Sequence, residues 1–239
     1  MTTGAYAAGT ASPVPPAAHR YLVVGNPIAH SRSPEIHAAF ARQTGAAIRY
    51  ERLLVPTEPP DAFARAMDAF FAGGGRGANV TLPFKERAFA YVARRSEGAA
   101  LAQAVNTLAV RDDGIHGDNT DGPGLVADLC GRLGLDLAGK SVLLLGAGGA
   151  ARGVVGSLLQ AGIAELSVVN RTRARADLLA ARFNDAACAR SAGLPRIQAL
   201  DLAAVRPADL IVNATSSGLL NGTLVLPPTL FRHCLLAYD

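Results

Sequence analysis

The stretch SVLLLGAGGAARGVVGSLLQAGIAELSVVNRTRAR, residues 141–175, decides the fold. It opens with a short apolar run over residues 142–145, which has the length of a buried strand. A glycine-rich turn follows at once, then a helix-compatible run over residues 150–161 and a second apolar run over residues 166–169. Strand, glycine turn, helix and strand in this order are typical of the mononucleotide-binding half of a doubly wound sheet.

The glycine turn predicts a binding site for a pyrophosphate. Glycines let backbone N–H groups approach the anion closely, and the helix behind the turn presents its positive end to the same charge. Ala151 stands where the usual G-x-G-x-x-G pattern ends, and the pattern tolerates alanine there. A tight turn that binds nothing is the alternative. The predicted cofactor contacts are Gly146, Ala147, Gly148, Gly149 and Ala150.

The end of the second strand indicates which dinucleotide binds. A site for NAD usually has Asp or Glu at this position, which accepts a hydrogen bond from the ribose 2′-hydroxyl. This chain has Asn170 there, followed by Arg171, Arg173 and Arg175. Guanidinium groups suit a 2′-phosphate, and no carboxylate at residue 170 repels it. We therefore expect NADP as the cofactor, and we expect Arg173 to solvate the exposed face of the next helix instead.

Composition narrows the classes of protein and of partner. The chain has 239 residues, enough for two modest domains, and half of them are hydrophobic. Its net charge of +4 comes from scattered basic residues, whereas a nucleic-acid-binding face needs a broader patch. No apolar stretch approaches the roughly 20 residues of a membrane span. Cys130, Cys188 and Cys234 lie far apart without a C-x-x-C, which predicts free thiols in a reducing cytoplasm and no metal site. We expect a small-molecule substrate and no nucleic-acid or membrane partner, and a homodimer is compatible with the sequence.

The order of the predicted elements indicates an α/β fold with two domains. Residues 1–19 are rich in Ala, Pro, Thr and Gly without periodicity, and we expect them to be disordered. Residues 20–121 form an N-terminal α/β substrate domain, where alternating helices and strands predict a parallel sheet. Residues 122–239 form a Rossmann-like, doubly wound NADP-binding domain. We expect strands at 21–25, 48–55, 77–81, 105–111 and 115–117 (these two as a hairpin), 142–145, 166–169, 197–200, 209–213 and 235–238, and helices at 33–44, 59–71, 85–94, 119–133, 150–161 and from the arginines to 183.

Polar side chains stand near the ends of the strands of the first domain, at the edge where open sheets bind ligands. Ser31 and Ser33 offer two hydroxyls at a helix start, which suits a carboxylate, although helix capping alone explains Ser33. Thr81 and Asn106 can hydrogen-bond hydroxyl groups, although Asn106 could simply cap a turn. Together with a domain for NADP, these side chains suit the reduction of a polyhydroxylated carboxylic acid.

Lysine is rare in this chain, because only Lys85 and Lys140 are lysines among the 23 basic residues. A lysine can release its proton whereas an arginine does not, so Lys85 is a candidate for acid–base chemistry. Asp121 could pair with Lys85 or could serve as a helix N-cap. In a coupled pair, either member could hold the proton that an alkoxide needs after hydride reaches a ketone.

Seven short motifs occur in order: SRSP, NVTLPFK, AVNT, GDNTDG, GAGGAAR, NRT and NATSSG. With them the chain resembles the shikimate dehydrogenases over residues 21–239. The resemblance implies reversible reduction of 3-dehydroshikimate to shikimate by NADPH, in the biosynthesis of aromatic amino acids.

The resemblance also implies roles for individual residues. Ser31 and Ser33 would hold the substrate carboxylate, and Thr81 and Asn106 would hold ring hydroxyls. Lys85 and Asp121 would be the catalytic pair and would also touch the substrate. The NATSSG stretch would line the cofactor cleft, with an ordinary turn as the alternative. The implied cofactor contacts outside the glycine turn are Asn170, Arg171, Thr172, Arg175, Thr215 and Ser216.

The resemblance further implies a continuation past Asp239, with contacts near the nicotinamide, a substrate-binding Gln and helices that pack onto the first domain. We therefore expect weak or absent activity from a chain that ends at Asp239. Two other functions stay open. A sister enzyme would oxidise quinate, with NAD, but Ser31, Ser33 and the missing acid at residue 170 disfavour it. A non-catalytic NADP-binding or regulatory module is the other alternative.

Overall fold

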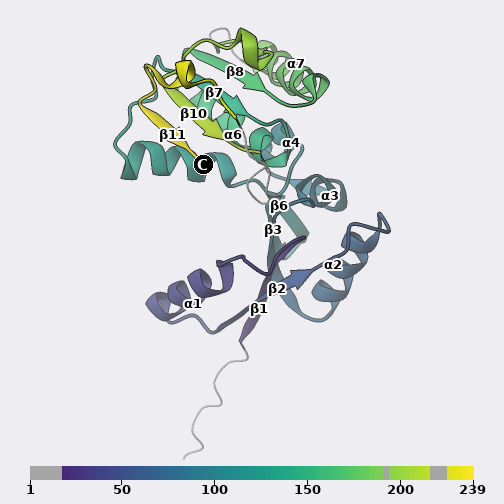
Figure 1. Cartoon of the computed structure of the whole chain (residues 1–239). Helices are drawn as coiled ribbons and strands as arrows, with labels where there is room; N and C mark the ends of the chain where they lie inside the picture. The colour runs from purple at the N-terminus through teal and green to yellow at the C-terminus, as the bar shows by residue number, and fades with distance from the viewer. Residues whose placement is uncertain (1–17, 191–193, 216–224) are drawn as a thin grey trace, which may run out of the picture.

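The computed structural model describes residues 18–190, 194–215 and 225–239. These residues form two bodies, each built around its own β-sheet, the first from the chain up to residue 118 and the second from residue 141 onward. Figure 1 shows the second sheet, in green and yellow, above the first, in purple and blue. Within the described ranges, no helix has the length and apolar character that crossing a bilayer requires. The α/β class expected from the sequence is confirmed.

The second sheet has the strand order β11-β10-β7-β8-β9, and all its strands are parallel. The order along the chain reverses between β7 and β10, so the carboxyl ends of these strands form the switch point of a doubly wound sheet. β7 passes directly into the glycine turn and helix α6, as the sequence predicts. The elements are β7 (Ser141–Leu145), α6 (Gly149–Gln160), β8 (Glu165–Val169), α7 (Arg173–Arg190), β9 (Ile197–Ala199), η2 (Leu202–Ala204), β10 (Leu210–Asn213), η4 (Pro228–Phe231) and β11 (Leu236–Tyr238).

The main core of this half lies between the sheet and its helices. Leu144 of β7 packs there with Leu158 of α6 and Phe183 of α7, and all three are buried. The next residue back along the strand, Leu143, faces the opposite side and joins a smaller cluster with Leu230 of η4. Because both faces of β7 are covered, this strand is a continuous apolar run, as is usual in parallel sheets.

The first sheet has the strand order β2-β1-β3-β5-β6-β4. β1, β2 and β3 are parallel, but β5 runs antiparallel to β3, and β6 antiparallel to β5. The predicted hairpin is confirmed, with Arg111 paired to Gly114, and the departure from the predicted parallel sheet is that β5 runs antiparallel to β3. β4 is parallel to β6. The strands are β1 (His19–Gly25), β2 (Ile48–Leu54), β3 (Gly75–Val80), β4 (Arg94–Arg95), β5 (Thr107–Arg111) and β6 (Gly114–Asp118).

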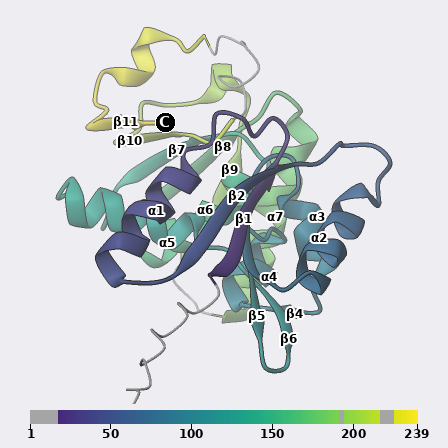
Figure 2. The ribbon, with the colours of Figure 1, turned by 90° about the horizontal axis from the view of Figure 1, so that it is seen from below.

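Helices α1 (Ser33–Thr44) and α2 (Ala62–Ala72) cover opposite faces of the first sheet. Figures 1 and 2 show them on either side of β1 and β2. α2 buries Phe63, Met67 and Phe70, whose spacing places them on one side of a helix. Phe63 stacks on Phe84, with ring centroids 5.3 Å apart, at the start of α3 (Lys85–Tyr91). α1 ends at Gly45 with a φ of +70°, a left-handed cap that glycine adopts without strain.

The chain between α3 and β5 differs from the prediction. α3 ends at Tyr91 instead of near residue 94, and Arg94–Arg95 form the edge strand β4, paired with β6. A helix that was not predicted, α4 (Glu97–Ala102), follows. Its N-cap Ser96 accepts a hydrogen bond from the Ala99 N–H at 3.1 Å. The cap residue was a signal for this helix, but six residues are too few to show a helical period.

The predicted helix over residues 119–133 is divided. α5 (Asp121–Val126) is α-helical and continues as η1 (Ala127–Arg132), which has the wider π-helical turn. α5 and α4 both pack against α6 of the second half, so these two short helices form the contact between the two sheets.

Asp209 connects the beginnings of two neighbouring strands. Its Oδ2 accepts hydrogen bonds from the Ser141 N–H at 2.8 Å and from the Ser141 hydroxyl at 2.7 Å. Its own N–H donates to Ser141 Oγ at 3.0 Å. The hydrogen bonds from the Ser141 backbone and side chain hold the pKa of Asp209 below its ordinary value.

We predict that Asp209→Ala lowers the free energy of unfolding by about 1–3 kcal/mol, because the Ser141 N–H loses its partner. Since the pKa of Asp209 is depressed in the folded protein, this contribution is present above the ordinary carboxyl pKa of about 3.9 and is lost as the pH falls through the folded value. Urea unfolding at neutral pH and at acid pH measures both effects.

The matched control is Asp201→Ala, because Asp201 is 73% exposed and pairs with Arg173 on the surface. We expect it to cost less than about 1 kcal/mol. Equal losses from the two variants would contradict the role given to Asp209.

Candidate active site

Lys85 and Asp121 form an ion pair between α3 and α5. Lys85 Nζ lies 2.6 Å from Asp121 Oδ2, and the two side chains are 12% and 23% exposed. The carboxylate does not cap a helix, because Thr120 occupies the N-cap position of α5 and makes no capping bond. Asp121 Oδ1 instead accepts a hydrogen bond from Asn106 Nδ2 at 2.8 Å. The pairing expected from the sequence is thus formed, in a largely buried setting.

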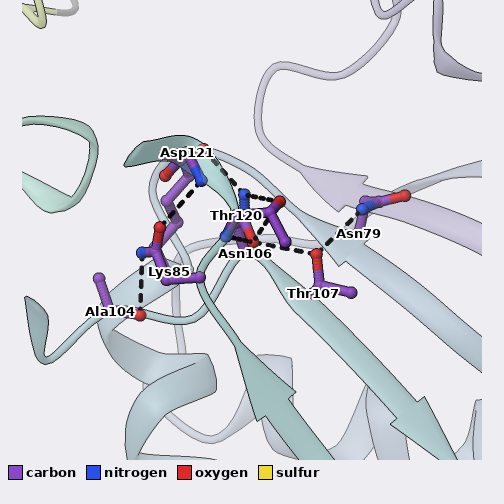
Figure 3. A network of polar contacts seen from close by, with 8 residues as sticks. Asn79, Lys85, Ala104, Asn106, Thr107, Thr120 and Asp121 are labelled. Atoms are coloured by element: carbon purple, nitrogen blue, oxygen red, sulfur yellow. Dashed lines mark hydrogen bonds and ion pairs between the residues drawn. The ribbon is translucent and has the colours of Figure 1, made fainter. Parts of the chain in front are cut away.

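Asn106 joins the beginning of β5 to the beginning of α5. Besides Asp121, its Nδ2 donates to Thr120 Oγ1 at 3.0 Å. Its Oδ1 accepts hydrogen bonds from the Thr120 N–H at 3.0 Å and from Thr107 Oγ1 at 2.9 Å. Figure 3 shows these contacts as one network that reaches from Asn79 to Lys85. Because every polar atom of the Asn106 amide has a protein partner, its orientation is fixed.

Asn119 is a supporting residue that the sequence analysis missed. It is 5% exposed, its Nδ2 donates to the Ala104 carbonyl at 3.0 Å, and its Oδ1 accepts from the Asp121 N–H at 3.1 Å. Helix α6 presses on the same place, since a Cβ added at Gly153 would lie 2.9 Å from Asp121 Oδ2. The D-N-T-D spacing was the available signal, because an Asn side chain often bonds the backbone two residues on.

A cavity of about 450 Å³ opens beside this pair, and a cavity of this size suits a small molecule. Ser31 and Ser33 lie together at its wall, with their hydroxyls 3.1 Å apart. Ser33 does not cap α1, because Arg32 occupies the N-cap position. His30, His37 and Asn79 line the same cavity and were not among the predicted residues. All six predicted substrate residues line it: Ser31, Ser33, Thr81, Lys85, Asn106 and Asp121.

The glycine turn lies at the switch point of the second sheet. Gly146 has a φ of +108°, its N–H donates to the Val169 carbonyl at 2.7 Å, and an added Cβ would lie 2.9 Å from the Ala214 carbonyl oxygen. Gly148 is the N-cap of α6, so Gly149 and Ala150 form its first turn, next to Ala147 in the loop. A Cβ added at Gly149 would lie 3.1 Å from Lys85 Cβ. The glycine turn and the ion pair are therefore adjacent.

The arginines after β8 are exposed and differ in their partners. Arg173 forms ion pairs at 3.0 Å with both Asp177 and Asp201, as expected for a residue that solvates the helix face. Arg171 and Arg175 make no ion pair with any residue in the described part of the chain.

The backbone around these arginines is held by Asn side chains. Asn170 Nδ2 donates to the Thr172 carbonyl at 2.9 Å. After β10, the N–H and hydroxyl of Thr215 donate to Asn213 Oδ1 at 3.1 and 2.8 Å. This turn follows the strand next to β7, so Thr215 lies on the cofactor side of the sheet. Ser216, the other predicted contact in this stretch, lies outside the described residues.

Comparison with known proteins gives a consistent result. Residues 23–108 match the family model described as "Shikimate dehydrogenase substrate binding domain", and residues 128–220 match "Shikimate / quinate 5-dehydrogenase". The chain is 50% identical over 226 residues to the shikimate dehydrogenase (NADP(+)) of Acidovorax sp., a match that covers 93% of this chain and 77% of the relative. It is also 50% identical over 220 residues to the enzyme of that name from Aromatoleum aromaticum, covering 92% and 77%.

A solved structure agrees with this result. Shikimate 5-dehydrogenase from Thermus thermophilus, in complex with NADP(H) and shikimate, matches with a TM-score of 0.73 and 36% identity. The match covers 87% of this chain and 73% of that one.

We predict that Gly146→Ala lowers stability by about 1–2 kcal/mol or more, because alanine is strained at a positive φ and its Cβ would press on the Ala214 carbonyl. It should also weaken dinucleotide binding, since the turn must shift. Thermal unfolding and a fluorescence titration with NADPH measure the two effects.

The control for this variant is Gly131→Ala in η1, where an added Cβ meets no atom within 4 Å. Alanine there should leave stability equal or raise it by up to about 1 kcal/mol. Normal dinucleotide binding by the Gly146→Ala protein would show that the turn does not hold the cofactor.

Proposed function

The chain belongs to the shikimate dehydrogenase family, and from this premise we propose that Lys85 and Asp121 are the acid–base pair of an NADPH-dependent reduction of 3-dehydroshikimate to shikimate. The protein is an NADP-dependent oxidoreductase of aromatic amino-acid biosynthesis. The observation that supports the residue assignment is the 2.6 Å contact between Lys85 Nζ and Asp121 Oδ2 inside the cavity.

The other walls of the cavity suit the rest of this substrate. The Ser31 hydroxyl donates to Ser33 Oγ at 3.1 Å, and two adjacent rotatable hydroxyls suit a carboxylate, which accepts a hydrogen bond from each once it replaces the contact between them. Thr81 lines the cavity with a hydroxyl that suits a ring hydroxyl. Asn106 also lines it, and would bind a ring hydroxyl in exchange for one of its bonds to Thr120 or Asp121. The two ends of the cavity therefore differ in chemistry, which orients a ring with a carboxylate on one side and a ketone on the other.

The residues present fit NADP. Gly146 adopts the positive φ that shapes the turn, a Cβ added at Gly148 would meet no atom within 4 Å, and the first turn of α6 directs its backbone N–H groups toward the pyrophosphate site. Gly148, Gly149 and Ala150 belong to this turn, and Thr215 faces it from the end of β10. Asn170, Arg171, Thr172 and Arg175 would surround the adenosine 2′-phosphate. When bound, NADPH supplies the hydride that reduces the ring ketone.

The chain's own residues handle the proton. The ketone oxygen needs a proton as it becomes a hydroxyl, and a positioned ammonium or carboxyl group can provide it. Lys85 Nζ donates to Asp121 Oδ2 at 2.6 Å, which places an ammonium and a carboxylate side by side at the point where the proton is needed. Asn106 and Asn119 hold Asp121 from its side chain and its backbone, which keeps the pair in one geometry. The low exposure of the pair excludes competing water.

We predict that Lys85→Ala lowers kcat for the NADPH-dependent reduction of 3-dehydroshikimate by about 10²–10⁴-fold relative to the parent protein. Substrate affinity should change much less, because the serines and Asn106 remain. Assays that follow NADPH absorbance give kcat and KM for each variant.

Lys140→Ala is the control, because Lys140 is the other lysine of the sequence and lies before β7, away from the cavity. Its kcat should stay within about twofold of the parent. Turnover of the Lys85→Ala protein within about tenfold of the parent would remove Lys85 from the mechanism. NADPH binding without turnover in the parent would favour a non-catalytic module instead.

We predict that Arg171→Ala and Arg175→Ala each raise KM for NADPH by about tenfold, because each removes a charged hydrogen bond to the 2′-phosphate. KM for NADH, which lacks this phosphate, should hardly change. The ratio of kcat/KM for the two cofactors is the measurement.

Arg173→Ala provides the matched comparison, since its guanidinium is already paired with Asp177 and Asp201. We expect it to leave the cofactor ratio within about twofold of the parent. A parent enzyme that prefers NADH, with quinate as its better substrate, would favour the quinate-oxidising alternative.

A further inference from the structure

Tyr50 of β2 stands between two cavities on one face of the first sheet. The substrate cavity and a second cavity of about 550 Å³ share His37 and Asn79 as lining residues, and Tyr50 lines the second one. Its ring stacks on His37, with centroids 4.0 Å apart and planes 14° from parallel. His37 Nδ1 donates in turn to the Ser33 carbonyl at 2.9 Å, since a carbonyl can only accept. Tyr50 is therefore held in place behind the wall of the substrate cavity.

The Tyr50 hydroxyl hydrogen-bonds to Asn79, a residue that lines both cavities. It donates to Asn79 Oδ1 at 2.6 Å. Burial raises the pKa of Tyr50 to about 12, so the hydroxyl keeps its proton near neutral pH. Asn79 thus always faces a donor on its oxygen side.

The contact of Asn79 Nδ2 supports the same orientation of the amide, with Oδ1 toward Tyr50. Asn79 Nδ2 lies 3.4 Å from Thr107 Oγ1, a long hydrogen bond that Figure 3 shows at one end of the network. Thr107 Oγ1 donates its own proton to Asn106 Oδ1 at 2.9 Å, so toward Asn79 it acts as an acceptor. A flipped amide would turn Oδ1 toward the accepting Thr107 Oγ1 and lose the hydrogen bond that Tyr50 donates, so the observed orientation is favoured. The second N–H of Nδ2 stays available to a ligand in the cavity that Asn79 lines.

We propose that Tyr50 is a positioning residue that fixes the Asn79 amide with an N–H available to the substrate, so that Asn79 adds a fixed donor to the cavity wall and favours a carboxylate. A serine hydroxyl can donate or accept, whereas this N–H can only donate, and an ionised carboxylate is acceptor-only. If the amide were free to turn, its oxygen could face the carboxylate and repel it. The inference rests on the proposed function, because it assumes shikimate as the ligand.

The test is Tyr50→Phe, which keeps the stacked ring and removes the hydroxyl. We expect Kd for shikimate, measured by calorimetry in the presence of NADP+, to rise about tenfold, the effect of one well-placed hydrogen bond. kcat should stay within about twofold of the parent, because the ion pair is untouched. With the methyl ester of shikimate, which has no carboxylate charge, the loss should shrink to about twofold.

Tyr91→Phe is the matched control. The Tyr91 hydroxyl also donates to one side chain, Asp68 Oδ1 at 2.9 Å, but it does not line the substrate cavity. We expect no change in Kd beyond about twofold. An equal loss from both variants would assign the effect to general stability and overturn the proposal.

A second pair of variants tests the route through Asn79. In an Asn79→Ala background, Tyr50→Phe should add no further loss, because the group that it positions is gone. Asn79→Asp keeps the acceptor for Tyr50 but loses the N–H, and should weaken shikimate binding by more than about tenfold. The Asn79→Asp measurement does not depend on Tyr50→Phe, so it tests the role of the Asn79 N–H even where the Tyr50→Phe protein fails to fold.

The outcomes separate this inference from the proposed function. A parent that binds no shikimate overturns both. A parent that binds shikimate, with Tyr50→Phe or Asn79→Asp binding it equally well, overturns the positioning role alone. An equal loss for shikimate and its methyl ester also overturns it, because carboxylate selection would then play no part.

Discussion

The contact between the Lys85 ammonium and the Asp121 carboxylate is the interaction on which the site depends. Removing two charged groups from water is costly, and their attraction offsets this only when the geometry is close and the remaining polar atoms have partners. Here the contact is 2.6 Å, and Asn106 satisfies the second carboxylate oxygen. The pair is a source of chemistry more than of stability, because it holds a transferable proton where water has little access.

The position of this pair follows from a departure from parallel topology. β5 and β6 are antiparallel, with Thr107 paired to Asp118, so the residues just beyond the ladder come together. Asn106 therefore meets Thr120 and Asp121, although 14 and 15 residues separate them along the chain. A parallel connection would have carried these side chains to separate places. The hairpin thus brings together the residues around the proposed acid–base pair, while the parallel strands β1 and β3 lead into the loops that supply the other residues of the cavity.

Helix α6 serves both halves of the molecule. Its first turn lies at the switch point, where N–H groups face the pyrophosphate site, and its flank rests on α4 and α5. This approach is close enough that a Cβ at Gly153 would lie 2.7 Å from Asn119 Oδ1. A glycine in a helix lowers the stability of that helix by about 1 kcal/mol relative to alanine. Gly153 therefore costs α6 some stability, but it allows α6 to approach Asn119 closely. The cofactor site and the ion pair consequently share one rigid support.

The sequence by itself determined the features that depend on neighbours along the chain. The glycine turn between apolar runs predicted the doubly wound sheet, and the arginines after β8 predicted NADP, because both follow from local spacing and charge. The β5–β6 hairpin and six residues that line the cavity were also predicted, from a turn signal and short motifs. Only the tertiary structure decided that β5 runs antiparallel to β3, that α4 forms, and that Asn119, Asn79 and Tyr50 contact the cavity residues or their network. Tyr50 and Asn79 are 29 residues apart, on strands separated by β1. Nothing in their local sequence signals the hydrogen bond between them, since sheet order, not spacing along the chain, sets which side chains meet.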